Sequence, residues 1–163
     1  MVNRPFHYLQ DSSGVECIDI MEQFASVSLA QAWRYLWRHE HKGNPVEDCS
    51  KAIWYLGRYR DSGPRPRPSS DVYEHPAFQK WREGTQPSLA AAAMTMVAMV
   101  DSGKFARDGV AIGALIDVVE HLIEAHRTRI ATTADLESAH RWKTSFLAAD
   151  RALQRVQAEQ EPQ

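Results

Sequence analysis

The chain of 163 residues lacks most of the sequence features that indicate a particular function. It has only two cysteines, Cys17 and Cys49, too few for a disulfide framework. It contains no GxxxxGK[ST] phosphate loop, no GxGxxG, no HExxH, no CxxC and no GxSxG motif. A conventional P-loop kinase is therefore excluded. Triads of Ser, His and Asp assembled from scattered positions carry no weight, because any chain of this length offers them.

The chain also lacks a strong overall charge and a long apolar run. The chain has nineteen basic and twenty-one acidic residues, which gives a formal net charge of −2 at pH 7. No global field therefore indicates nucleic acid or an anionic membrane as a partner, and any basic site must be local. No segment resembles a signal peptide or a membrane span, so we expect a protein of a reducing cytoplasm without a membrane partner.

No apolar alternation of useful length predicts a strand, whereas helix signals recur along the chain. We therefore predict an all-α fold, a bundle of about five to seven helices with an extended N-terminal arm. The proline-rich segment 61–71 predicts a linker. It separates a helical core with the arm, residues 1–60, from a helical region, residues 72–163, that we expect to pack on the core or to mediate oligomerisation.

Caps and breakers position the individual helices. Ser28 followed by Gln31 has the spacing of a capping box and predicts the start of the second helix. Asn44 as N-cap, with Pro45 and Glu47 in the first turn, predicts the start of the third. The other bounds that we predict are 15–25 for the first helix, an end near residue 60 for the third, and 76–83, 87–103, 109–127 and 133–160 for the rest.

Four cations converge on the turn between the two central helices. They are Arg34, Arg38, Lys42 and Lys51. The start of the following helix adds amide donors and a positive dipole end, so an anion can bind there. The alternative is a solvated helix face with ion pairs one turn apart, such as Glu47 with Lys51.

Three groups of residues have the spacing of metal ligands. Glu16 and Asp19 lie one helical turn apart and can share Mg²⁺, although carboxylates in a first turn also simply complement the helix dipole. Asp117 and Glu120 form a second candidate, with a solvent-facing polar stripe as the alternative. The segment His39-Glu40-His41 suggests zinc, yet no distant Cys or His pair completes a tetrahedron.

The aromatic and apolar residues chiefly indicate a core. We expect Trp33, Trp37 and Trp54 to be buried, although Trp37 or Tyr55, which lie off the apolar stripes, can stack on a base. The run Leu89–Val100 is apolar nearly all round, which predicts burial on most sides or a contact between subunits.

A series of motifs occurs in order between His7 and Tyr59. They are His7-Tyr8, Gly14-Val15-Glu16-Cys17-Ile18-Asp19, Ala32-x-Arg34-Tyr35-Leu36-x-Arg38, Lys42-Gly43 and Glu47-Asp48-x-x-Lys51-Ala52-x-Trp54-Tyr55-Leu56. This series resembles the SaV-like family of small phage and prophage proteins, over about a third of the chain. Gln31 stands where that family usually has Asn, and Arg34 where it usually has Lys.

Most members of the family have no assigned activity. One relative, a nucleotide kinase of a T-odd coliphage, phosphorylates deoxynucleoside monophosphates without a P-loop and forms a large homo-oligomer. The resemblance therefore implies a nucleotide site, a homo-oligomer and, for a phage-encoded chain, the host cytoplasm.

The leading hypothesis is a nucleotide-metabolism protein that binds (deoxy)nucleotide phosphates, as a nucleoside monophosphate kinase without a P-loop. Positioning and charge stabilisation carry most of phosphoryl transfer, so cations between helices are chemically sufficient. The residues assigned to catalysis are His7, Asp48 and Lys51. Those assigned to nucleotide or phosphate binding are Tyr8, Arg34, Arg38, Lys42, Lys51 and Tyr55.

Two other hypotheses stay open. A pyrophosphohydrolase similar to the all-α MazG-like enzymes would hold Mg²⁺ with Glu16 and Asp19, or with Asp117 and Glu120. Mg²⁺ is the one cofactor that these hypotheses call for. A non-catalytic helical module would instead bind a host or phage protein through the apolar run Leu89–Val100 and the last helix.

Overall fold

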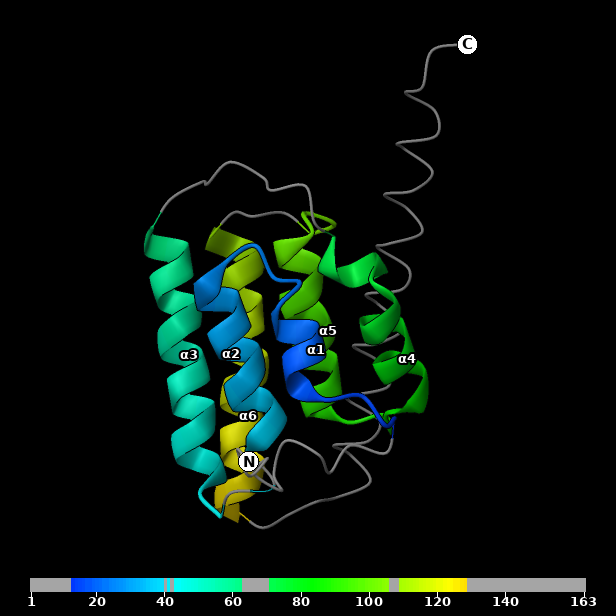
Figure 1. Cartoon of the computed structure of the whole chain (residues 1–163). Coiled ribbons are helices and arrows are strands. Elements are labelled where there is room, and N and C mark those ends of the chain that lie inside the picture. The colour runs from blue at the N-terminus through cyan, green and yellow to red at the C-terminus, as the bar shows by residue number, and fades with distance from the viewer. Residues whose placement is uncertain (1–12, 40, 42, 63–70, 106–108, 129–163) are drawn as a thin grey trace, which may run out of the picture.

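The computed structural model describes residues 13–39, 41, 43–62, 71–105 and 109–128, and every regular element in these ranges is a helix (Figure 1). The predicted all-α bundle is confirmed. The elements are α1 (Cys17–Met21), α2 (Val27–Arg38), α3 (Pro45–Asp61), the short 3₁₀ helix η2 (Val72–Glu74), α4 (Pro76–Gly84), α5 (Leu89–Asp101) and α6 (Gly109–Thr128). The N-terminal arm, most of the linker and the helix predicted over 133–160 lie outside the described residues.

Helix α2 starts earlier than predicted, and the capping box at Ser28 and Gln31 is wrong. The N-cap is Ser26, whose hydroxyl oxygen accepts a hydrogen bond from the Leu29 amide at 3.3 Å. The carboxylate of Asp101 accepts hydrogen bonds from the amides of the two residues that precede the helix, at 2.8 and 3.0 Å. This contact from the end of α5 fixes the chain just before α2, so a distant residue decides where the helix begins.

Helix α3 starts as predicted. Asn44 is its N-cap, Pro45 lies in the first turn, and the Asn44 side-chain oxygen accepts from the Glu47 amide at 3.4 Å. Gly43, with a φ of +77°, supplies the left-handed backbone of the turn that leads into α3. Helix α1 covers only Cys17–Met21 and is shorter than its predicted range.

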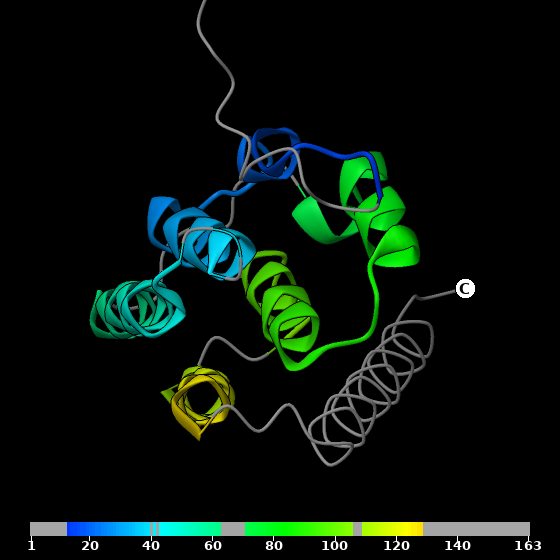
Figure 2. The same ribbon diagram turned by 90° about the horizontal axis from the view of Figure 1, so that it is seen from below.

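The four longest helices form a bundle that two short ones cover on one side. Helix α2 packs against α3 and α5, and α6 packs against the same two helices from the far side (Figure 2). Helices α2 and α3 run antiparallel side by side (Figure 1). Helices α1 and α4 contact each other, and α1 also contacts α2. The surface shared by α2 and α3 therefore lies at one edge of the bundle.

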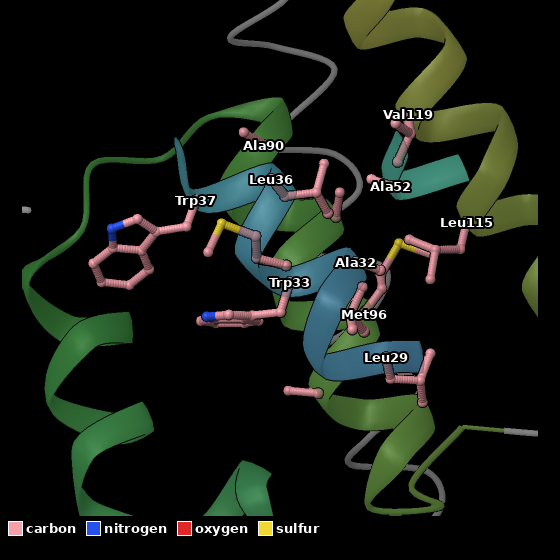
Figure 3. Packing of buried hydrophobic residues seen from close by; sticks show 14 of the residues in the cluster. Leu29, Ala32, Trp33, Leu36, Trp37, Ala52, Ala90, Met96, Leu115 and Val119 are labelled. Carbon is pink, nitrogen blue, oxygen red and sulfur yellow. The ribbon is translucent and has the colours of Figure 1, made fainter. Parts of the chain in front are cut away.

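One hydrophobic core joins the residues before and after the linker. Trp33 of α2 lies at its centre, with ring centroids 4.8 Å from Trp81 and 5.7 Å from Phe78, both on α4. Trp33 and Trp37 point to the same side of α2 (Figure 3). Helix α5 is buried within the chain on nearly all sides, so its apolar run needs no second subunit to cover it. None of the described helices is long and apolar enough to span a membrane.

Candidate functional site

The cationic side chains of α2 and α3 meet at the ring of Tyr35. Its centroid lies 5.0 Å from Arg34 Cζ, 4.5 Å from Arg38 Cζ and 5.8 Å from Lys51 Nζ. The ring also stacks on Tyr55 of α3, with centroids 5.7 Å apart and an interplanar angle of 21°. Cations are attracted to the faces of aromatic rings, so the ring helps to hold three like charges together. We call these five residues the Tyr35 cluster.

Helical spacing and the antiparallel packing of α2 and α3 build this cluster. On α2, Arg34 and Arg38 are one turn apart and Tyr35 follows Arg34 directly, which places all three on one side of the helix. On α3, Lys51 and Tyr55 are also one turn apart. The two helices lie side by side (Figure 2). The Tyr35 ring of α2 stacks on Tyr55 and lies near Lys51, so the two sets of side chains meet.

Arg38 and Asp48 form a buried bidentate ion pair across the two helices. Arg38 Nε donates to Asp48 Oδ2 at 2.9 Å, and a terminal nitrogen donates to Oδ1 at 2.7 Å. Only 9% of the Arg38 side chain and 4% of the Asp48 side chain are exposed. Planar ion pairs with two parallel hydrogen bonds fix the guanidinium in one orientation. The ion pair thus joins Arg38, a predicted phosphate-binding residue, to Asp48, a predicted catalytic residue.

Lys51 is engaged more loosely. Its ammonium group contacts the Glu47 carboxylate one turn earlier on α3, which is the ion pair that the sequence offered as the alternative interpretation. The hydrogen bond that Lys51 donates to the Glu47 carboxylate raises the pKa of Lys51 above its usual value. Both side chains are about half exposed, at 42% and 52%. A solvated pair contributes little stability and can exchange its partner readily.

Arg34 has no comparable partner. In the part of the chain that the structure describes, no carboxylate pairs with it, and its Nε is buried without a hydrogen-bond acceptor. A buried donor in this condition costs free energy until an acceptor reaches it. Arg34 therefore holds unused hydrogen-bonding capacity and uncompensated charge at the edge of the cluster.

The start of α1 lies beside the two guanidinium groups. Burial raises the pKa of the Cys17 thiol to about 12, although Arg34 and Arg38 act in the opposite direction. The thiol is therefore neutral at physiological pH and not a nucleophile. Neither Cys17 nor Tyr35 is among the site residues predicted from the sequence. The position of Tyr35 between two arginines on one helix face was the available signal.

The first turn of α3 carries its own carboxylates. Glu47 and Asp48 already provide two carboxylates in its first turn, and Asn44 Nδ2 donates to Glu47 Oε2 at 2.6 Å. These groups complement the positive end of the helix. Of the four predicted cations, Arg34, Arg38 and Lys51 meet at the ring of Tyr35. Of the remaining predicted site residues, His7, Tyr8 and Lys42 lie outside the described residues.

The predicted metal ligands are placed as follows. Asp19 Oδ2 accepts from the Glu16 amide at 3.1 Å, so this pair serves as a helix cap. Asp117 and Glu120 are exposed on α6. Among the described residues no group of three or more His, Cys, Asp and Glu side chains has the arrangement of a metal site.

Among the described residues the histidine segment forms no zinc site either. Its first member, His39, is buried, and its Nδ1 lies 2.5 Å from the Leu36 carbonyl oxygen. The His39 ring packs against His126 of α6 with centroids 5.1 Å apart. Glu40 lies outside the described residues. The ring of His39 therefore helps to join α2 to α6.

Trp54 is the one tryptophan whose predicted burial is wrong. It is 57% exposed, whereas Trp37 is 6% exposed and belongs to the core. The buried side of α3 carries Cys49, Ala52 and Leu56, and Trp54 points away from it. A large exposed aromatic ring beside the Tyr35 cluster is a feature that a core alone does not require.

Comparison with known proteins gives one match. A family model described only as a protein of unknown function, DUF3310, matches residues 2–57. No curated protein and no solved structure matches the chain. The matched region contains α1, α2 and most of α3, and therefore the whole Tyr35 cluster.

Proposed function

We propose that the chain binds the phosphate group of a (deoxy)nucleotide at the Tyr35 cluster and works in nucleotide metabolism as a nucleoside monophosphate kinase without a P-loop. One observation carries the proposal: three cations gather on a single aromatic ring, and one of them, Arg34, has no carboxylate partner among the described residues. Clustered cations repel one another, so an anion at this place is favoured.

The local charge supports a phosphate ligand. Three cations of the cluster are opposed by two carboxylates, Glu47 and Asp48, which leaves one positive charge beside Tyr35. If phosphate displaces Glu47 from the exposed pair with Lys51, two cations face the ligand while Arg38 stays with Asp48. Charge-assisted hydrogen bonds from arginine to phosphate are among the strongest that proteins form.

The buried pair assigns different roles to its members from those that the sequence suggested. Asp48, 3% exposed, is better suited to fix Arg38 than to touch a nucleotide. Arg38 in turn positions the ring of Tyr35 and contributes its positive charge there. Arg34 and Lys51 are then the residues that contact phosphate. Phosphoryl transfer needs such positioned positive charge where negative charge develops.

The resemblance to the SaV-like family is the support for the reaction class, and the Tyr35 cluster is the support for the location of the site. No observation on the described residues favours the MazG-like alternative. Of its two candidate carboxylate pairs, Glu16 and Asp19 cap α1, while Asp117 and Glu120 are exposed on α6.

Titration calorimetry with a panel of deoxynucleoside mono- and triphosphates, with and without Mg²⁺, tests the proposal. We expect heat with at least one nucleotide, and Arg34→Gln should weaken binding by about 10- to 100-fold, the loss of one or two charged hydrogen bonds. Arg34→Lys should retain most of the affinity because it keeps the charge. Arg127→Gln, an exposed arginine on α6, is the matched control. Absence of heat with every nucleotide would refute the proposal.

A further inference from the structure

The aromatic and cationic surface continues along α3 beyond the Tyr35 cluster. Lys51, Trp54, Tyr55 and Arg58 follow one another at positions i, i+3, i+4 and i+7, so they form one stripe on the helix. Trp54 and Arg58 are exposed, and Lys51 and Tyr55 are partly buried. We call this set, with Tyr35 and Arg34 of α2, the α2–α3 face.

The rings and cations of this face form an unbroken row. Arg58 Cζ lies 5.6 Å from the centroid of Trp54, whose ring meets Tyr55 edge to face at 4.8 Å. Tyr55 stacks on Tyr35, and Arg34 lies over Tyr35. Cations therefore stand at both ends of three consecutive aromatic rings. The outermost ring, Trp54, is more than half exposed.

The chemistry of the row selects its ligand. A mononucleotide has one base and carries its phosphates on one side of its sugar, so it cannot place phosphates at both ends of the row. A single strand of nucleic acid repeats both elements and can place a base on an exposed ring and phosphates on cations at both ends. Arginine beside an aromatic ring adds attraction for the same ligand.

We propose that a single-stranded nucleic acid binds along the α2–α3 face, with a base stacked on Trp54 and phosphates at Arg58 and at the Tyr35 cluster. The formal net charge of −2 does not oppose this, because the cations are concentrated on one face. Recognition rests on ring faces and phosphates, so binding is largely independent of base sequence. This activity goes beyond nucleotide binding and does not require phosphoryl transfer.

Fluorescence anisotropy of the full-length protein with labelled oligothymidylates, from a dinucleotide to a dodecamer, tests the proposal. We expect affinity to rise with length and to fall with salt. Three phosphate contacts, by Arg34, Lys51 and Arg58, predict a slope of log K against log salt of about −2. Trp54→Ala should weaken binding of the dodecamer by about 5- to 150-fold, the contribution of one stacked base.

Two further variants keep the result interpretable. Trp54→Phe retains a ring and should restore most of the affinity, whereas Val110→Ala, which removes an exposed apolar side chain from α6, should change nothing. Circular dichroism confirms that each variant is folded. No binding at low salt, or equal binding by wild type and Trp54→Ala, would overturn the proposal.

The remaining outcomes are also decisive. If the dodecamer binds no tighter than thymidine monophosphate, the face takes one nucleotide and the proposal is wrong. If light scattering shows self-association without oligonucleotide, and Trp54→Ala abolishes it, the face joins two copies of the chain and the proposal is likewise wrong. Oligonucleotide binding without mononucleotide binding would support this proposal and refute the proposed nucleoside monophosphate kinase activity.

Discussion

Replacing Asp48 with alanine should strongly destabilise the protein. The change leaves the Arg38 guanidinium buried between α2 and α3 without the carboxylate that now accepts from two of its nitrogens. Both side chains are less than a tenth exposed, so water can replace the lost carboxylate only in part. Removing one partner of a buried ion pair costs about 3–5 kcal/mol in the free energy of unfolding.

Urea denaturation followed by circular dichroism measures this cost, and a double-mutant cycle isolates its origin. Arg38→Met removes the charge and keeps much of the volume. If the penalty of Asp48→Ala comes from an uncompensated cation, the double variant should be more stable than Asp48→Ala alone. The coupling free energy should exceed about 1.5 kcal/mol.

Asp61→Ala is the matched control, since it removes a carboxylate from the same helix. Its pair with Arg60 is solvated, with the Asp61 side chain 69% exposed, and the change should cost less than about 0.5 kcal/mol. If Asp48→Ala behaved like Asp61→Ala, Arg38 would not be held by a buried pair. The role given to Asp48 as a positioning residue would then be wrong.

Two other predictions concern stability. Asp101→Ala should lower the free energy of unfolding, measured by urea denaturation, by about 2–4 kcal/mol, because two amides before α2 lose their acceptor. A loss below about 0.5 kcal/mol would contradict this role of Asp101. The folded chain keeps the proton of Cys17 up to a pKa of about 12, whereas the unfolded thiol loses it near 9.0. Stability should therefore fall as pH rises above 9.0, and Cys17→Ala should reduce that alkaline slope; an unchanged slope would contradict a buried neutral thiol.

Local signals predicted those parts of the fold that local contacts determine. Asn44 caps α3 through a hydrogen bond to an amide only three residues away, so its role could be predicted from spacing alone. The start of α2 could not, because Asp101, which fixes the chain before it, lies at the far end of α5. Ser28 had an equally good local pattern, and the tertiary contact decided between the two.

The candidate site was predictable in its cations but not in its organisation. Arg34, Arg38 and Lys51 do come together, yet the ring that gathers them depends on how α2 and α3 are aligned, which no single helix encodes. Residue type predicts a core position for Trp54, because tryptophan usually packs there. Trp54 instead lies opposite the buried side of α3. The helical periodicity of the buried residues predicts this exposed position correctly, whereas residue type does not.

The most direct test of phosphate binding at the Tyr35 cluster is phosphorus NMR of a deoxynucleoside monophosphate titrated with the protein. The cluster predicts that wild type changes the chemical shift of the phosphate resonance. Arg34→Gln should abolish this change, and Arg127→Gln should preserve it. An unchanged resonance with wild type, or the same change with Arg34→Gln, would contradict the central claim.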